Sequence, residues 1–364
     1  MHKHAKYFNA FNLIDGIGPV SLKKILTHFT SIKEAWLTNN SEFNNLGLMP
    51  SIINQIKKCR DKINPDLEFE KLIKENIELI TIEDNNYPKL LKEIYTPPTV
   101  LYVRGNLDLN NDLSIGIVGS RLLSTYGRQV TPIISTDLAK SGITIISGLA
   151  KGIDALAHRA AVECGGKTIA VLGSGIDKKS IYPYVNKNLS EDIIASGGAL
   201  VGEYPIGSSP LAQHFPQRNR IVSGLSQGIL VIEASQKSGS LITAQTALDQ
   251  NRDVFAIPGP IFSKTSEGAN NLIKIGAKAV TDANDILQEL NLSLITERKE
   301  KKEIIADNKE EELILQQLSS EPIHIDKIVN ITRLSTATIN STLTIMELKG
   351  KLQNLGSGLY AIKQ

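Results

Sequence analysis

The sequence predicts an α/β protein whose central part is a doubly wound parallel sheet, and two observations support this fold class. Short runs rich in β-branched residues alternate with longer stretches of helical periodicity between residues 112 and 290. Two of those runs, Ile115–Val118 and Ile143–Ile146, are apolar throughout, as expected for strands that helices cover on both faces. An open sheet of this kind is Rossmann-like.

The chain of 364 residues is long enough for two or three domains. We expect a helical N-terminal domain over residues 1–110, the α/β core over 111–291, a linker over 292–309 and a C-terminal domain over 310–364. The linker is predicted from the charged stretch Glu297–Glu312, which lacks aromatic side chains.

Two helical patterns in the first domain flank a short segment that contains Gly16, Gly18 and Pro19. This arrangement predicts a helix-hairpin-helix unit, because the glycines permit a tight turn and proline suits the first turn of a helix. Such a hairpin can present backbone N–H groups to a DNA phosphate, or it can simply pack against its neighbours. Lys23 and Lys24 favour phosphate contact, whereas the presence of only one such hairpin does not.

The core has strand and helix candidates in alternation. The predicted strands are Ser114–Val118, Ile143–Ile146, Thr168–Leu172, Ala199–Val201, Ile229–Ile232, Val254–Ile257 and Lys278–Val280. Among the predicted helices are Tyr126–Lys140, Ile153–Glu163 and Leu241–Gln250.

The last domain has the element order of a winged helix. Glu311–Leu318, Ile325–Val329 and Ser335–Leu348 are predicted helices, and Gly350–Ile362 is a predicted hairpin. The helix that would read DNA, Thr336–Lys349, is almost uncharged apart from its end. Strong duplex binding is therefore disfavoured, and a protein-contact role stays open.

Composition excludes several functions. Cys59 and Cys164 are too few for a disulfide framework, which favours the cytoplasm. The histidines and cysteines lack metal-ligand spacing, so we expect no metal site. We also expect no cofactor. No apolar run approaches the roughly 20 residues of a membrane span. The net charge is only +2, so a nucleic-acid site would have to be formed by folding.

Ligands of open parallel sheets bind beyond the carboxyl ends of the strands. The first core strand ends in Gly119, Ser120 and Arg121. Together they offer close backbone approach, a hydroxyl and a bidentate cation for phosphate oxygens. The alternative is an ordinary strand-to-helix turn with a surface arginine.

The second core strand leads into a glycine-rich turn. Lys151 and Gly152 stand at a helix start that suits an anion. Asp154 and His158 are one helical turn apart, and with no nucleophile nearby we expect them to form a structural pair.

The third core strand ends in Gly173, Ser174 and Gly175, which begin like a dinucleotide fingerprint and could contact an anion. Lys178 stands where the third glycine of that fingerprint belongs. The acidic residue that would bind the ribose about 20 positions further on is also missing from the pattern. NAD binding is therefore disfavoured.

A proline-fixed turn at residues 213–221 is the segment most suggestive of nucleic acid. Phe215 could stack on a base, while Arg218, Asn219 and Arg220 could contact phosphates or bases. In the alternative interpretation, Phe215 is a core residue and the arginines lie on a solvated helix start.

Small residues follow the fifth core strand. Ser238, Gly239, Ser240 and Thr243 could form an anion nest at a helix N-terminus, or could only cap that helix. Several such turns along one sheet edge indicate a polyphosphate ligand.

Together these residues resemble the DNA-processing protein A (DprA/Smf) family over nearly the whole chain. The resemblance rests on the following segments: Gly119-Ser120-Arg121, residues 147–154 with His158, residues 215–221, Glu233-Ala234, Ser238-Gly239-Ser240, Thr243-Ala244 and Pro258-Gly259.

The resemblance implies a Rossmann-like core that binds single-stranded DNA, with a SAM-like helix-hairpin-helix domain before it and a winged helix after it. It implies a homodimer that protects incoming strands and loads the RecA recombinase in natural transformation. Arg121 would bind a phosphate, Phe215 would stack or pack beside a base, and Arg218 and Arg220 would line the groove.

Two other functions compete. The core also resembles nucleotide phosphoribohydrolases, but Thr243 occupies the position of their catalytic glutamate. Threonine cannot activate water as a carboxylate does, so we expect that the protein is not an enzyme. The third possibility is an adaptor whose winged helix binds other proteins.

Overall fold

The computed structural model of the chain describes residues 4–110, 113–290, 308–315, 317–318, 323–332, 334–349, 351–356 and 358–362. The chain forms two compact units, Met1–Ile286 and Leu287–Gln364. Each unit has buried apolar clusters of its own, as independently folding units require.

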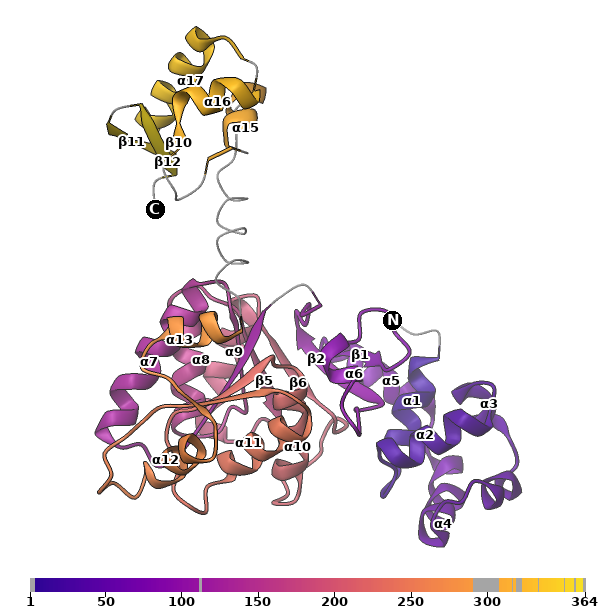
Figure 1. Cartoon of the computed structure of the whole chain (residues 1–364). Coiled ribbons are helices and arrows are strands. Elements are labelled where there is room, and N and C mark those ends of the chain that lie inside the picture. The colour runs from indigo at the N-terminus through magenta and orange to yellow at the C-terminus, as the bar shows by residue number, and fades with distance from the viewer. Residues whose placement is uncertain are drawn as a thin grey trace. The chain divides into compact units, whose positions relative to one another are not determined.

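One sheet runs through the larger unit, and its described residues form nine strands (Figure 1). The order is β1-β2-β6-β5-β4-β3-β7-β8-β9, and the strands from β6 to β9 in this order are parallel. The parallel strands are β3 (Ser114–Val118), β4 (Thr144–Ser147), β5 (Thr168–Leu172), β6 (Ala199–Gly202), β7 (Gly228–Val231), β8 (Asp253–Ala256) and β9 (Lys278–Ala279). Each lies within one residue of its predicted position, and the doubly wound fold is confirmed.

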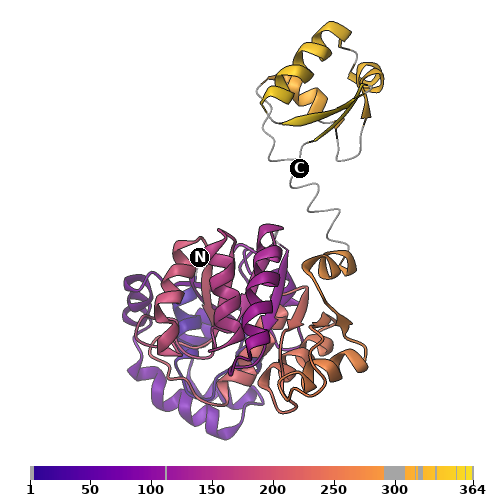
Figure 2. The same cartoon turned by 90° about the vertical axis from the view of Figure 1, so that its left-hand side faces the viewer.

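Helices cover both faces of this sheet (Figures 1 and 2), which is why β3, β4 and β5 are buried along their whole length. One layer is formed by α7 (Thr125–Lys140), α8 (Ile153–Glu163) and α9 (Lys187–Ala195). The other contains α10 (His214–Gly224) and α11 (Gly239–Asp249), and α12 (Glu267–Lys274) and α13 (Ala283–Glu289) follow. The chain runs outward from β3 to β6 and returns beside β3 as β7, so the strand order reverses at β3. Open α/β sheets bind ligands at such a switch point.

The antiparallel edge of the sheet was not predicted from the sequence. β1 (Glu78–Thr81) pairs with β2 (Val100–Gly105), and β2 pairs with β6. The helical character expected up to residue 110 is therefore interrupted by two strands. The domain boundaries remain predictions.

The helices before these strands include the expected hairpin. α1 (Ala5–Asn12) and α2 (Pro19–His28) flank a turn in which Gly16 has a φ of +83°, a left-handed conformation that glycine adopts without strain. Pro19 is the first residue of α2, as predicted. The neighbouring helices are α3 (Ile32–Leu37), α4 (Pro50–Cys59), α5 (Pro65–Lys74) and α6 (Lys89–Lys92).

The smaller unit is a winged helix, which confirms the predicted C-terminal fold. Its elements are α15 (Lys309–Leu315), β10 (Ile323–His324), α16 (Ile325–Thr332), α17 (Thr336–Leu348), β11 (Leu352–Gly356) and β12 (Leu359–Ile362). Ile314, Ile339 and Leu343 are fully buried in its core. Buried Glu311 forms ion pairs with Lys349 (3.1 Å) and Lys351 (2.6 Å), so its charge is compensated.

None of the helices in the described ranges has both the length and the apolar character needed to cross a membrane.

Candidate functional site

A groove lies at the switch point of the sheet, at the carboxyl ends of β3, β4 and β7. It consists of a hollow of about 540 Å³ and an adjoining hollow of about 120 Å³. Arg121, Phe215, Arg218 and Ala150 line both hollows, so the two form one continuous switch-point groove.

Two glycines allow the turns after β3 and β4 to meet at the groove. A Cβ atom on Gly119 would lie 2.6 Å from the Cγ1 atom of Ile153, which is too close for any packed pair. Gly152 has a φ of +87°, and a Cβ atom there would lie 2.2 Å from the carbonyl oxygen of Ser120. The Ile153 amide donates to that same oxygen at 3.1 Å. Glycine is therefore required for the close approach of the two turns.

The turn after β3 exposes Arg121 to solvent. The Ser120 hydroxyl donates to the Leu122 carbonyl oxygen (2.6 Å) and accepts from the Leu122 amide (3.1 Å), so this serine stabilises the turn. The Arg121 guanidinium makes no hydrogen bond or ion pair with any residue that the structure describes. Its central carbon lies 5.5 Å from the ring centroid of Phe215, within the range of a cation–π contact.

Phe215 is half-buried, so it is neither a core residue nor a freely exposed one. Its ring lines both hollows and lies 5.8 Å from the ring of Tyr182. Tyr182 was not among the predicted site residues, although it precedes Pro183 as Phe215 precedes Pro216. The predicted proline-fixed turn at residues 213–221 is corrected to a helix, because α10 already begins at His214. Asn219, one helical turn after Phe215, also lines the larger hollow.

Arg218 lines both hollows, although it is only 5% exposed. Its Nη1 atom donates to the carbonyl oxygens of Gly148 (2.6 Å) and Val171. Burial, with a smaller effect of neighbouring Arg121, lowers the pKa of Arg218 to about 10, so it stays charged at neutral pH. Arg218 therefore lines the groove, as the resemblance implied, and its direct contact with a phosphate stays a prediction. Its charge lies close to that of Arg121, and a bound anion would relieve the repulsion between the two.

Asp154 and His158 do not form the predicted pair, because each has another partner. Asp154 is buried and accepts from the amides of Gly148 (3.1 Å) and Ala150 (3.3 Å). Burial raises the pKa of Asp154, and nearby Arg218 opposes this shift. His158 is fully buried, and its Nδ1 atom lies 2.7 Å from the Thr168 hydroxyl.

The N-terminus of α11 forms the far wall of the larger hollow. The Ser238 hydroxyl accepts from the Ser240 amide (3.4 Å) and lies 2.7 Å from the Ser240 hydroxyl, so Ser238 caps the helix. Gly239 has open space around it, and Thr243 lines the same wall. The positive end of the helix dipole faces the groove and favours an anion there.

Lys151 is exposed and lines the smaller hollow, where it adds a further positive charge.

The turn at Gly173, Ser174 and Gly175 is not part of the groove, which corrects the expectation of an open anion site there. Ser174 is buried, and the Gly175 amide donates to the carbonyl oxygen of Ser208 at 3.0 Å. His214 Nδ1 lies 3.3 Å from the Gly173 carbonyl oxygen. The segment from Ser208 to His214 therefore contacts this turn, and the sequence pattern held no sign of that contact.

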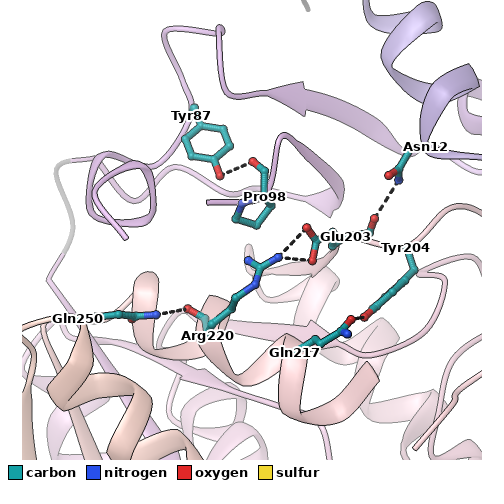
Figure 3. Close-up of polar contacts among 8 residues, drawn as sticks. All are labelled: Asn12, Tyr87, Pro98, Glu203, Tyr204, Gln217, Arg220 and Gln250. Atoms are coloured by element: carbon teal, nitrogen blue, oxygen red, sulfur yellow. Dashed lines mark hydrogen bonds and ion pairs between the residues drawn. The ribbon is translucent and has the colours of Figure 1, made fainter. Parts of the chain in front are cut away.

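Arg220 is also separate from the groove, which corrects its predicted role. Figure 3 shows its guanidinium paired with the carboxylate of Glu203, at 2.7 and 2.5 Å from the two oxygens. Burial raises the pKa of Glu203, and Arg220 opposes that shift. Arg220 thus balances a largely buried carboxylate on the opposite flank of α10.

No cluster of three or more His, Cys, Asp or Glu side chains suited to a metal occurs among the residues that the structure describes.

Comparisons with known proteins agree with this architecture. Residues 78–291 match the family described as DNA recombination-mediator protein A, and residues 298–358 match the DprA winged helix domain. Protein Smf of Synechocystis is 36% identical over 94% of this chain and 95% of its own length. DNA processing protein DprA of Streptococcus pneumoniae is 47% identical over 57% of this chain and 73% of its own length.

Solved structures show the same fold. The X-ray structure of DprA from Streptococcus pneumoniae has a TM-score of 0.67 and 37% identity, covering 78% of this chain and 97% of that chain. A DprA structure from Helicobacter pylori, described in terms of its single-stranded DNA binding mode, has a TM-score of 0.53 and 29% identity. It covers 60% of this chain and 96% of that chain.

The fold is that of a Rossmann-like α/β protein with an appended winged helix, and the family that its core matches is described as a DNA recombination mediator. The chain belongs to the DNA processing protein A (DprA/Smf) family.

Proposed function

We propose that the switch-point groove binds single-stranded DNA without strong sequence preference. The observation that carries this proposal is the unpaired, exposed guanidinium of Arg121 beside the ring of Phe215. Such a pair offers a phosphate contact and a stacking surface side by side, as single-strand binding sites do. The described single-stranded DNA binding mode of the Helicobacter pylori relative supports the same assignment.

The strand would lie across both hollows of the groove. A phosphate would bind between Arg121 and the N-terminus of α11, above the buried charge of Arg218. A neighbouring base would stack on Phe215, with Tyr182 and Lys151 lining the continuation of the path. A duplex keeps its bases stacked inside and offers none to these rings.

The test is fluorescence anisotropy with labelled single- and double-stranded oligonucleotides across a salt series. We expect preference for the single strand, and a clear decrease of affinity with salt. Arg121→Ala should weaken binding to every sequence and reduce the magnitude of the salt slope by about one.

Arg159→Ala is the matched control, because Arg159 is exposed on α8 and lines neither hollow. It removes the same charge and should leave affinity nearly unchanged. Equal effects of the two substitutions would show that Arg121 acts only through net charge, and an unchanged affinity in Arg121→Ala would exclude this groove.

We infer that the groove binds without catalysis. Among its described lining residues the carboxylate is that of Asp154, which is buried and accepts backbone amides. Thr243 offers no general base. Release of free base from nucleoside 5′-monophosphates by the pure protein, abolished by Thr243→Ala, would contradict this inference.

We further propose that the protein acts in the cytoplasm as a homodimer that protects incoming strands and loads RecA during transformation. Family membership supports this role, and the two free cysteines suit a reducing compartment. DNA-dependent ATP hydrolysis by RecA on strands coated with single-strand-binding protein should start sooner when this protein is added. Arg121→Ala should remove the acceleration, and sedimentation should give twice the mass of one chain.

A further inference from the structure

A further hollow lies on the opposite flank of α10, beside the ion pair of Arg220 with Glu203 and outside the switch-point groove. Its volume is about 840 Å³, larger than either part of the switch-point groove. The hairpin residues Gly16–Val20 form one side, and Tyr204, His214, Gln217 and Arg220 form the other. We refer to it as the hairpin cleft.

The core side of the hairpin cleft carries a stacked aromatic pair. The rings of Tyr204 and His214 lie 3.9 Å apart with an interplanar angle of 18°. The Tyr204 hydroxyl donates to Oε1 of Gln217 at 2.9 Å, which fixes the position of both side chains (Figure 3). Gln213 also lines the cleft and is exposed. Flat rings bordered by amides are the chemistry with which proteins hold unpaired bases.

The charges of the cleft favour a base over a bare phosphate. Arg220 is neutralised by the two-oxygen ion pair with Glu203, and exposed Asp15 lines the hairpin side, so the described lining residues of the cleft offer a phosphate no unpaired arginine or lysine. The hairpin adds the apolar side chains of Ile17, Pro19 and Val20. Binding sites for small flat ligands combine apolar lining with a few oriented polar groups in this way.

The hairpin cleft and the switch-point groove are separated only by the first turns of α10. Phe215 and Asn219 line the groove, whereas His214 and Gln217 line the cleft. A helix with its side chains is about 10–12 Å across, so a strand that leaves the groove reaches the cleft by crossing one helix end.

We propose that the hairpin cleft holds an unpaired base of the same DNA strand, stacked on the Tyr204–His214 pair and hydrogen-bonded by Gln213 or Gln217. This inference rests on the proposed single-strand binding at the groove. It assigns the N-terminal hairpin a direct part in extending the DNA footprint.

The test compares a short oligothymidylate of about six nucleotides, which fills the groove, with one of about twenty, which also reaches the cleft. Val20→Asp places a negative charge at the hairpin, where Val20 is 60% exposed. Ile133→Asp is the matched control, because Ile133 is also 60% exposed and β-branched but lies on α7, away from every hollow described. His214→Ala removes one ring and leaves the hairpin unchanged.

Val20→Asp and His214→Ala should each weaken binding of the long oligonucleotide by at least about fivefold and leave the short one unaffected, while Ile133→Asp changes neither. An unchanged ratio of long to short affinity in both cleft variants would overturn this inference. Arg121→Ala tests the groove separately, because it must weaken both lengths. Binding of thymidine monophosphate alone, lost in Val20→Asp, would identify a free nucleotide as the occupant and contradict the proposal.

Discussion

Gly152 occupies the point where the turns after β3 and β4 come closest. Its φ of +87° disfavours any other residue, and a Cβ atom would meet the Ser120 oxygen at 2.2 Å. We predict that Gly152→Ala lowers the free energy of unfolding by about 1–3 kcal/mol and weakens DNA binding, because the turn that carries Arg121 must move. Urea denaturation and anisotropy measure the two effects.

Gly142→Ala is the control that separates the cost of backbone strain from the effect of displacing the turn that carries Arg121. Gly142 has a similar φ of +77°, but a Cβ atom there meets nothing within 4 Å. This substitution should therefore cost about 1 kcal/mol and leave DNA affinity unchanged. Loss of affinity in both variants would mean that stability, and not the position of Arg121, controls binding.

His158 couples the stability of the core to pH. Burial, with a smaller effect of Arg218, lowers its pKa from 6.5 to about 3. Below pH 6.5 the unfolded chain binds a proton that the folded chain does not, so the free energy of unfolding falls as the pH decreases. Between pH 8 and 5 this effect amounts to about 2 kcal/mol.

His158→Gln removes this titrating group and isolates its effect. The difference in unfolding free energy between the wild type and the variant should shift by about 2 kcal/mol between pH 8 and 5, in favour of the variant at low pH. A constant difference across that range would show that His158 titrates in the folded chain as it does in water.

Residue types in the groove were predictable, but the directions of their side chains were not. The sequence does not distinguish the three arginines, but their environments differ. Arg121 is exposed, Arg218 donates to backbone oxygens and Arg220 pairs with a carboxylate. The last two depend on Gly148, Val171 and Glu203, which lie at least 17 positions away in the chain. Local patterns cannot report such partners.

At the scale of elements, β2 and α1 join the N-terminal helices to the sheet. The buried Tyr102 hydroxyl donates to Oδ1 of Asn9 (2.8 Å) and accepts from Nδ2 of Asn12 (3.1 Å). We predict that Tyr102→Phe lowers the free energy of unfolding by about 1–3 kcal/mol, because it leaves a buried amide without its partner. Urea denaturation measures the loss.

Tyr126→Phe is the control for this element. The Tyr126 hydroxyl donates to the backbone oxygen of Pro258 at 2.9 Å, in an exposed position where water can replace the bond. Its cost should stay below about 0.5 kcal/mol. Equal costs for both substitutions would show that the contact of α1 with β2 adds no particular stability.

The strands that were predicted from the sequence and the strands that were missed differ for a physical reason. The central parallel strands, such as β3 and β4, are buried on both faces, so their apolar runs stand out from the amphipathic helices between them. β1 and β2 follow a helical segment, and they join the sheet because β2 pairs with β6. In this pairing Val103 lies opposite Val201, which is distant in the chain. A pairing between distant segments leaves no local periodicity.

The whole molecule consists of two units with separate cores, and each is expected to respond separately to substitution. Trp36 is the sole tryptophan of the sequence and is buried in the larger unit, so its fluorescence reports on that unit. The winged helix has a small core and correspondingly little stability to lose.

Leu343→Ala tests this independence. Leu343 is fully buried in the winged-helix core, and its truncation should cost that unit about 2–5 kcal/mol, enough to unfold it at low urea. Far-ultraviolet circular dichroism should then show an early loss of helix, while the Trp36 transition keeps its midpoint. Affinity for the short oligonucleotide should stay unchanged, because every residue assigned to the groove lies in the larger unit.

Leu348→Ala provides the control on the same helix, since Leu348 is 83% exposed and should cost less than about 0.5 kcal/mol. If Leu343→Ala weakened binding of the short oligonucleotide, the winged helix would contribute to the DNA contact itself. If it left that binding intact but abolished the acceleration of RecA, the winged helix would act through protein contacts, as its nearly uncharged third helix favours. The two readouts together therefore decide between a DNA-reading and a protein-binding role for this unit.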